Sequence, residues 1–349
     1  MDSITQLALG AAVGEATLGR KVGNRAIAWG AIAGTLPDLD VFVPLGDAVS
    51  DFTYHRSASH SLLMLALATP LLVGAITRIH PDTRKYWRGW ALAIYGVFAT
   101  HVLLDSLTSY GTQIFWPVST TPVSLSTIFI IDPLYTLPLL AGVIAALVMT
   151  RESSRGHRLN RLGLAASTLY LAWTMAVKVV VDNRFETALE RQGIAHRAVF
   201  TTPAPFTSIL WRAVVMTGQG YYESYYSLLD GDAKIRFTPY PSDDSLLASI
   251  EDHWPVRRLR WFSKGFYSVR NLDGDIVISD LRMGIEPNYV FSFKVGEFGN
   301  PHAVPTPPEQ LQATRDFSQL PLLWERIRDP SVELSPVFAT AKSDRTPVE

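Results

Sequence analysis

The chain has 349 residues, with 31 Lys and Arg against 32 Asp and Glu, so its net charge is −1 when the histidines are neutral. This balance provides no basic stripe of the kind that nucleic-acid-binding domains carry, and we expect no nucleic-acid partner. Cysteine is absent, which excludes disulfides and cysteine-ligated zinc or iron–sulfur sites and leaves His, Asp and Glu as side chains for a metal.

Long uncharged stretches occupy the first half of the chain, residues 1–182. Because a bilayer core requires about 20 mostly apolar residues, four stretches with their flanks are long enough to cross a membrane: 60–78, 89–109, 128–150 and 162–182. Two shorter apolar segments, 4–19 and 26–36, precede them. The sequence therefore predicts an all-α membrane bundle of about six helices, two of them short. The alternative is a buried helical bundle in a soluble protein.

The first apolar segment has two features that bear on its role. Gly10 and Gly14 form a small-xxx-small pair, which lets two helices approach closely in a membrane. A secretory signal peptide begins with basic residues, whereas the first basic residue here is Arg20. We therefore expect segment 4–19 to be a helix packed against the others.

Basic residues are concentrated in every second connection between these segments. The connections 37–59 and 110–127 contain only Arg56, whereas the other three hold Arg20, Lys21 and Arg25, then Arg78, Arg84, Lys85 and Arg88, then Arg151, Arg155, Arg158 and Arg161. Short loops rich in Lys and Arg face the cytoplasm. We therefore expect the N-terminus, the two loops with few basic residues and everything after Asp182 to lie outside the cytoplasm.

The second half of the chain has the pattern of a soluble α+β domain over residues 183–335, followed by a flexible tail at 336–349. Segment 185–192 is typical of the end of a helix, and a Pro-rich stretch begins at His302. Short runs of β-branched and aromatic residues predict a small antiparallel sheet, with a hairpin turn at 272–275. The expected strands are 213–216, 221–227, 233–237, 265–269, 275–279 and 290–295.

The polar residues of the first half share one location, at or near the outer ends of the predicted helices. His101 and Asp105 are four residues apart, so they project from one face of a helix. Ionisable residues within a membrane segment are costly and point to a functional site; the alternative is a His–Asp hydrogen bond that fixes two helices together. The other members are Asp2, Gln6, Asp38, Asp40, His55, Arg56, His60 and Asp132.

This set of side chains suits a divalent metal. Asp38 and Asp40 repel each other unless a metal or solvent neutralises them. His60 follows Ser57 and Ser59, which are candidate caps of the next helix. Neutral imidazole and carboxylate groups suit zinc, manganese or iron, and zinc is the usual hydrolytic choice. A catalytic site keeps one ligand position open for water.

Several motifs together resemble the YdjM-like family, bacterial inner-membrane proteins described as metal-dependent hydrolases. The motifs are Met1-Asp-Ser-Ile-Thr-Gln6, Pro37-Asp-Leu-Asp40, His55 to Ser61, His101 to Asp105 and Thr108 to Thr112, and the resemblance covers about residues 1–150. It implies a multi-pass protein of the inner membrane. The family is distantly similar to zinc-dependent phospholipase C and P1-type nucleases, which implies phosphoester hydrolysis, including that of lipid headgroups.

The resemblance also implies roles for individual residues. Asp38, His60, His101 and Asp105 would be the metal ligands. Asp40, His55 or Asp132 would complete a second metal site or act as general base, and Asp2 would be a ligand or orient one. Arg56 would clamp a phosphate bidentately or be a surface arginine. Many relatives have His at the position of Gln6. Glutamine is a poorer zinc ligand than histidine, so one or two ions are expected.

Two classes of function remain. The first is a membrane-embedded hydrolase acting on a lipid or other phosphoester at the outer leaflet, with the outer domain covering the site and selecting the substrate. The second is a membrane transporter or sensor scaffold whose His/Asp cluster is structural or handles ions. A transporter places polar groups at the midplane and on both sides. The sequence defines no oligomeric state.

Overall fold

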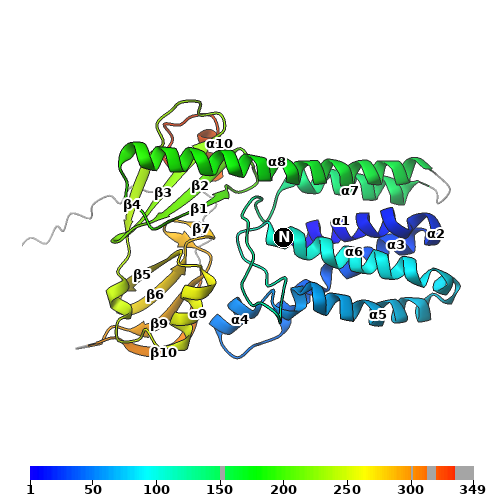
Figure 1. Cartoon of the computed structure of the whole chain (residues 1–349), viewed down its shortest axis with the longest axis horizontal. Helices are drawn as coiled ribbons and strands as arrows, with labels where there is room; N and C mark the ends of the chain where they lie inside the picture. The colour runs from blue at the N-terminus through cyan, green and yellow to red at the C-terminus, as the bar shows by residue number, and fades with distance from the viewer. Residues whose placement is uncertain (150–153, 300–301, 313–319, 335–349) are drawn as a thin grey trace, which may run out of the picture.

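The computed structural model describes residues 1–149, 154–299, 302–312 and 320–334. A helical region comes first and an antiparallel-sheet domain follows, as the sequence predicted. In Figure 1 the helices lie side by side in one half of the molecule and the strands form the other half. The N-terminus lies at the end of the helical region that faces the strands.

The helical region contains every helix that the apolar segments predicted. The segment 4–19 becomes α1 (Ser3–Gly14), a π-helical turn η1 (Glu15–Gly19) and α2 (Arg20–Val22), and 26–36 becomes α3 (Asn24–Thr35). The four longer segments become α5 (Leu62–Ile79), α6 (Trp87–Ser106), α7 (Pro133–Val148) and α8 (Ser154–Gln192). α7 begins at Pro133 because proline suits the first helical position and Asp132 caps the helix.

The connection between α3 and α5 contains short elements that the sequence did not predict. They are the 3₁₀ turns η2 (Pro37–Phe42) and η3 (Ala58–His60) and the helix α4 (Ala48–Tyr54). Asp47 caps α4 by accepting hydrogen bonds from the backbone of Val49 and Ser50. The two 3₁₀ turns carry three of the candidate site residues, Asp38, Asp40 and His60, so their conformation decides where those side chains lie.

α1 and α3 pack backbone against backbone. A Cβ atom on Gly10 would lie 2.3 Å from the carbonyl oxygen of Gly30, and one on Gly34 would lie 2.5 Å from the carbonyl oxygen of Gln6. Such distances exclude any side chain at these positions. The close approach predicted from Gly10 and Gly14 is therefore confirmed, and its partner surface is Gly30 and Gly34 of α3.

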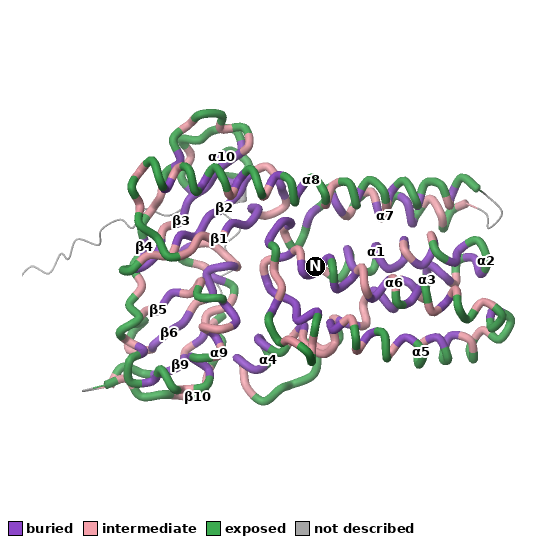
Figure 2. Tube along the Cα trace, viewed as in Figure 1, coloured by how far each residue is buried: buried purple, intermediate pink, exposed green. Residues whose placement is uncertain are grey.

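Two helices of the described residues are long and apolar enough to cross a membrane by length and composition, α5 and α8. α7 is a shorter apolar helix. Figure 2 shows that the faces of the helices turned toward one another are buried, whereas the outer sides of α5 and α8 are largely exposed. The bundle of about six membrane helices therefore stays a prediction.

Two of the basic connections, α2–α3 and α5–α6, lie together at the end of the helical region farthest from the strands (Figure 1). Residues 150–153 of the third lie outside the described residues. Arg25, just after α2, forms an ion pair of 2.5 Å with Asp82 in the α5–α6 connection, the 3₁₀ turn η4 (Pro81–Tyr86). Lys21 lies over the ring of Tyr86 in the same turn. The alternation of basic and basic-poor loops thus corresponds to two opposite ends of one structure.

The second half contains two four-stranded sheets, not the one small sheet that we expected. The first has the order β1 (Ala198–Pro203), β2 (Leu210–Met216), β3 (Gly220–Ser227), β4 (Phe237–Pro241). The second has the order β10 (Val304–Leu311), β9 (Ser292–Glu297), β6 (Asp275–Asp280), β5 (Tyr267–Leu272). A two-stranded ribbon, β7 (Gly284–Ile285) with β8 (Asn288–Tyr289), and the helices α9 (Trp254–Phe262) and α10 (Leu320–Arg326) complete the domain.

One strand prediction was wrong in its bounds, and the interpretation of the Pro-rich stretch after His302 as the start of a tail was wrong as well. The run 233–237 forms a strand only from Phe237, because residues 230–232 turn and 233–236 continue without strand pairing. The Pro-rich stretch after His302 is not a tail but contains β10, which pairs with β9 alone. Prolines are tolerated there because an edge strand needs backbone donors on one side only. The hairpin turn at 272–275 is confirmed. The predicted tail, 336–349, lies outside the described residues.

α8 runs without a break across position 182, where the sequence suggested a domain boundary. Its last third packs on the first sheet: Val177, Val181 and Phe185 form a core cluster with Trp211 and Tyr226. The helix therefore belongs to both halves, and it fixes the sheet domain to the helical region.

The glycine contact between α1 and α3 yields a first prediction. Gly30→Ala should lower the free energy of unfolding by about 1–3 kcal/mol, the usual cost of overpacking, because the added methyl would meet Gly10 backbone at 2.3 Å. Gly74→Ala on α5 is the matched control, since a Cβ there meets nothing within 4 Å, and the better helix propensity of alanine should leave it neutral or stabilised. Thermal unfolding in detergent measures both. Equal melting temperatures for the two variants would contradict the packing.

Candidate metal centre

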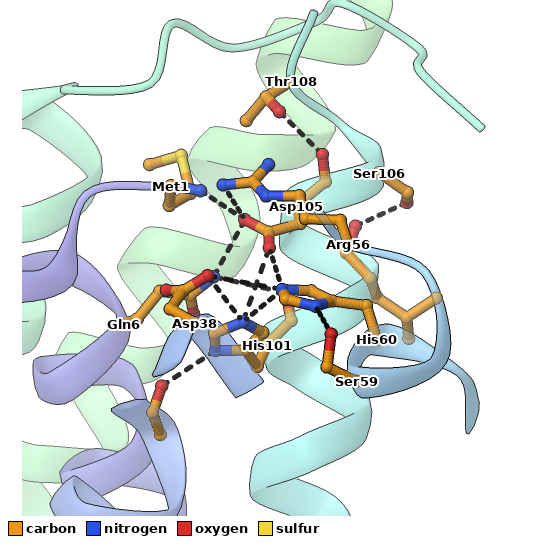
Figure 3. A network of polar contacts seen from close by, with 12 residues as sticks. Met1, Gln6, Asp38, Arg56, Ser59, His60, His101, Asp105, Ser106 and Thr108 are labelled. Atoms are coloured by element: carbon orange, nitrogen blue, oxygen red, sulfur yellow. Dashed lines mark hydrogen bonds and ion pairs between the residues drawn. The ribbon is translucent and has the colours of Figure 1, made fainter. Parts of the chain in front are cut away.

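Four side chains from three elements meet at the end of the helical region that faces the sheets. They are Asp38 of η2, His60 of η3, and His101 and Asp105 of α6. Each offers one ligand atom, and these four atoms all lie within 4.8 Å of one another. His60, His101 and Asp105 are buried and Asp38 is half-buried. Figure 3 shows the four side chains pointing toward a common centre.

The spacing of the ligand atoms is that of a tetrahedral metal site. His60 Nε2 lies 3.2 Å from His101 Nε2, 3.3 Å from Asp38 Oδ1 and 3.2 Å from Asp105 Oδ2. His101 Nε2 lies 3.6 Å from Asp38 Oδ1 and 3.4 Å from Asp105 Oδ2. Ligand atoms held about 2.0–2.2 Å from a tetrahedral zinc ion lie about 3.3–3.6 Å from one another. Five of the six pairs are thus close to the zinc geometry.

Both imidazoles are oriented so that Nε2 faces the cluster as an acceptor. His101 Nδ1 donates a hydrogen bond to the carbonyl oxygen of Gly34, at 2.8 Å. Ser59 Oγ donates its proton to Asp40 at 2.5 Å, so it accepts from His60 Nδ1 at 3.0 Å. In the neutral tautomers that carry the proton on Nδ1, two lone pairs and two carboxylates would face one another. A cation between them removes this repulsion, and partners of this kind on the far nitrogen are typical of metal-bound histidine.

The two carboxylate oxygens of Asp105 have different environments: one faces the cluster and the other faces neighbouring donors. Oδ2 is buried, faces both histidines and makes no hydrogen bond with the residues that the structure describes. Oδ1 accepts a hydrogen bond from Gln6 Nε2 at 3.0 Å, contacts the amino group of Met1 and lies 3.4 Å from Arg56 Nη2. The buried oxygen without a donor fits a metal ligand, while Oδ1 is held in place by positive charge and an amide.

Asp40, His55 and Arg56, the proposed catalytic residues, lie beside the cluster and not in it. Asp40 accepts hydrogen bonds from His55 Nδ1 at 2.7 Å and from the Arg56 backbone nitrogen at 3.0 Å. Burial alone would raise the pKa of Asp40, but the hydrogen bond and charge of His55 outweigh it, with Ser59 adding to the effect, and the pKa lies below its usual value. Asp40 therefore stays ionised and holds the turn that carries His60.

Arg56 is the most unusual member of this group. Its backbone has φ 62°, a left-handed conformation that costs a non-glycine residue about 1–3 kcal/mol. Its side chain is buried, with 4% of its surface exposed. Nε and Nη1 have no hydrogen-bond partner within the described part of the chain. Buried donors in proteins are usually paired, so these donors make Arg56 a candidate for binding an acceptor such as water or an anion.

Asp2 and Asp132, proposed as further metal ligands, are not brought into the cluster. Asp2 caps α1 and accepts from the backbone nitrogens of Ile4 and Thr5. Asp132 caps α7 and also accepts from the Tyr170 hydroxyl at 2.7 Å. An aspartate immediately before a helix is well placed to bind the free backbone N–H groups of the first turn, and that local demand accounts for both side chains.

Gln6 and Tyr110 also shape the site. Sequence reasoning gave Tyr110 no individual role. Gln6 takes no place among the four ligand atoms and instead donates to Asp105 Oδ1. Tyr110 lies under Arg56, with the guanidinium carbon 5.2 Å from the ring centroid. Its position within the segment 108–112 was the only available signal. Of the histidines expected to lack partners, His157 contacts Glu15 at the opposite end of the helical region.

The comparisons with known proteins identify the family. Residues 1–181 match the family described as YdjM inner membrane protein. The chain belongs to this family. The match ends at the last turns of α8, so the two sheets lie beyond it. No curated protein and no solved structure matches the chain. The YdjM match therefore confirms the resemblance seen in the motifs and supports a place in the inner membrane.

The cluster predicts which variants lose metal. His101→Ala and Asp105→Ala should each reduce bound metal from about one ion per chain to nearly none after dialysis, because each removes one of four tetrahedral ligands. Asp132→Asn should retain it, since asparagine still caps α7 and Asp132 lies outside the cluster. Elemental analysis of the purified proteins measures the ratio. Full metal content in the alanine variants would make these residues helix-packing groups.

Proposed function

We propose that this YdjM protein is a membrane-embedded, metal-dependent hydrolase that cleaves phosphoester or lipid-headgroup bonds at the outer face of the bacterial inner membrane. The observation that carries the proposal is the pairing of two features. The first is a four-ligand cluster with close to tetrahedral spacing, and the second is a buried arginine, Arg56, with free donors. The two are joined by the ion pair between Arg56 and the ligand Asp105. A metal beside an unsatisfied guanidinium is an arrangement suited to an anionic, hydrolysable substrate.

Asp38, His60, His101 and Asp105 would hold the ion. Two imidazoles and two carboxylates suit zinc best, with manganese and iron as alternatives, and the spacing of the ligand atoms fits one tetrahedral ion. Because the four side chains fill a tetrahedral shell, such an ion would polarise a phosphoryl oxygen or acidify water in a fifth coordination position. Asp40 lies behind His60, on the far side of Ser59, so its role is to orient that ligand and not to bind a second ion.

Arg56 would bind the substrate phosphate. Its planar fork of N–H donors matches two phosphate oxygens, and Nη2 already lies 3.4 Å from Asp105. Nε and Nη1 lie on different edges of the guanidinium, so an oxyanion at either one would satisfy a free donor and neutralise the charge that is buried there. His55, with Nδ1 fixed by Asp40 at 2.7 Å, has the carboxylate–imidazole arrangement of a general acid or base.

Apolar exposure around the site supports a membrane setting and a lipid substrate. α5 begins two residues after His60, and Leu63, Leu67 and Leu71 on its outer face are exposed. Between Asp38 and α4, the segment 39–45 exposes Leu39, Val41, Phe42, Val43 and Leu45, with Phe42 at 79%. Monomeric soluble proteins rarely expose contiguous apolar surface of this kind. A bilayer that covers α5 would meet this segment at the level of its headgroups.

The ion-handling alternative has one observation in its favour. Glu15 in η1 is buried and contacts His157, and Asn160 donates to Glu15 at 2.5 Å and to the carbonyl oxygen of Ala12 at 2.9 Å. This places a second polar cluster at the basic end of the helical region. Polar groups at both ends are a property of transporters. The hydrolase is preferred because the tetrahedral spacing and the free arginine donors occur together at one end.

Hydrolysis is tested with the zinc-loaded protein in detergent, on a soluble aryl phosphodiester and on phospholipid in mixed micelles. The wild type should release product, and Arg56→Gln should lower kcat/KM about 10- to 100-fold, the loss of a charged hydrogen bond of about 1.5–3 kcal/mol. Its metal content should not change, because Arg56 is no ligand. Arg25→Gln, at the opposite end, is the control. A metal-loaded wild type that is inactive on both substrates would overturn the proposal.

The proposed topology is tested with reporters. Loops with many basic residues stay in the cytoplasm, so a reporter fused after residue 200 should be active only if it functions after export. The same exported-type reporter inserted in the loop 78–88 should be inactive, and a cytoplasmic reporter there should be active. Activity of a cytoplasmic reporter after residue 200 would refute both the orientation and the outer location of the site.

A further inference from the structure

The second sheet shares its hydrophobic core with the loops that carry the site. Val49 and Phe52 of α4 and Tyr110, from the loop after α6, are buried in one cluster with the inner residues of the sheet domain. The domain contributes Leu247, Ile250, Val256, Leu259, Phe262, Val269, Ile276, Ile278, Phe293 and Val295. The sheet domain is thus not a separate cover laid over the helical region, because part of its core belongs to the motif loops.

Tyr110 is the residue at which this shared core reaches the site. On one side its ring makes edge contacts with Phe262 and Phe291 of the sheet domain, with centroids 5.5 and 5.7 Å apart. Its hydroxyl donates to the carbonyl oxygen of Phe52 at 2.5 Å. On the other side the ring contacts His55 at 5.4 Å and lies 5.2 Å from the guanidinium carbon of Arg56. One ring therefore joins the sheet domain to Arg56.

Arg56 depends on this ring because little else fixes its side chain. Its backbone is anchored by the nitrogen bond to Asp40 and by the carbonyl, which accepts from the Gln113 nitrogen at 2.9 Å. Among the described residues, the guanidinium approaches only Asp105 as a charged partner, through Nη2 at 3.4 Å. The face of Tyr110 supplies the second contact, a cation–π interaction in a buried setting. These two contacts act together with the surrounding packing to define the plane of the guanidinium, and loss of the ring would remove one of them.

We propose that Tyr110 is a positioning residue for Arg56, and that the sheet domain sets the anion-binding geometry of the site through Phe262, Phe291 and Tyr110. The proposal rests on the proposed function of Arg56 as an anion-binding group. The metal ligands come from η2, η3 and α6 and contact one another. A disturbance in the shared core should therefore weaken anion binding while the metal stays bound.

The experiment measures bound metal and the affinity of the zinc-loaded, full-length protein for inorganic phosphate. Tyr110→Leu removes the ring and should raise the phosphate Kd about 2- to 30-fold, the range of a cation–π contact, with unchanged metal content. Tyr110→Phe keeps the ring and loses only the hydroxyl bond to Phe52, so its Kd should stay within about twofold of wild type. Arg56→Gln should raise the Kd as well, and adding Tyr110→Leu to it should cause no further loss, because coupled residues are not additive.

A matched pair of core variants separates positioning from stability. Phe262 and Phe185 are both fully buried, but Phe262 contacts Tyr110 and Phe185 lies in the α8 cluster with the first sheet. Phe262→Leu should weaken phosphate binding and Phe185→Leu should not, although both lower the melting temperature. If phosphate binds in an Arg56-dependent manner and both Tyr110→Leu and Phe262→Leu bind as wild type, the positioning role is refuted and the proposed function stands. If the wild type binds neither metal nor phosphate, both fail.

Discussion

Two imidazole nitrogens, His60 Nε2 and His101 Nε2, face each other at 3.2 Å with a carboxylate oxygen on either side. In a buried setting, a group of acceptors without a cation is costly, because neither water nor a donor compensates them. On the far sides of these groups, Gly34 and Ser59 accept hydrogen bonds from the two imidazoles and Gln6 donates one to Asp105, and none of these contacts reaches the inner atoms. A cation at this point would satisfy the inner atoms, and the helices and turns are arranged around the four side chains that could hold it.

The glycine packing of the helices is part of the same arrangement. Gly34 lies against the backbone of Gln6 on α1, and its carbonyl oxygen holds the ring of His101 on α6. The absence of a side chain therefore lets α1, α3 and α6 converge at the site. Gln6 approaches Asp105 from the same side. A histidine at this position would offer a further ligand atom, whereas this chain has an amide that donates to Asp105.

The sheets add a second level of control. α8 carries the first sheet on its last turns, and the second sheet completes its core with Phe52 and Tyr110 from the site loops. These sheets lie beyond the residues that match the YdjM family. The helical region and its ligands are thus the shared part, and this chain combines them with a domain that contacts the residues around the metal cluster. The contact between the second sheet and the site loops consists of buried apolar and aromatic side chains. It can therefore fix the positions of the site residues, but it brings no charge to them.

The sequence by itself determined the helices, the opposite ends of the helical region and the set of candidate ligands. Apolar segment length, the alternation of basic loops and the four-residue spacing of His101 and Asp105 are local properties, and they needed no knowledge of distant contacts. Only the tertiary structure decided which polar residues converge. Asp38 joins the cluster while Asp40, two residues later, turns to His55 and Ser59, and Asp2 and Asp132 satisfy helix ends. Asp2 and Asp132 cap helices because backbone donors of the next turn lie close in the sequence, whereas the four side chains of the cluster come from segments far apart in the chain.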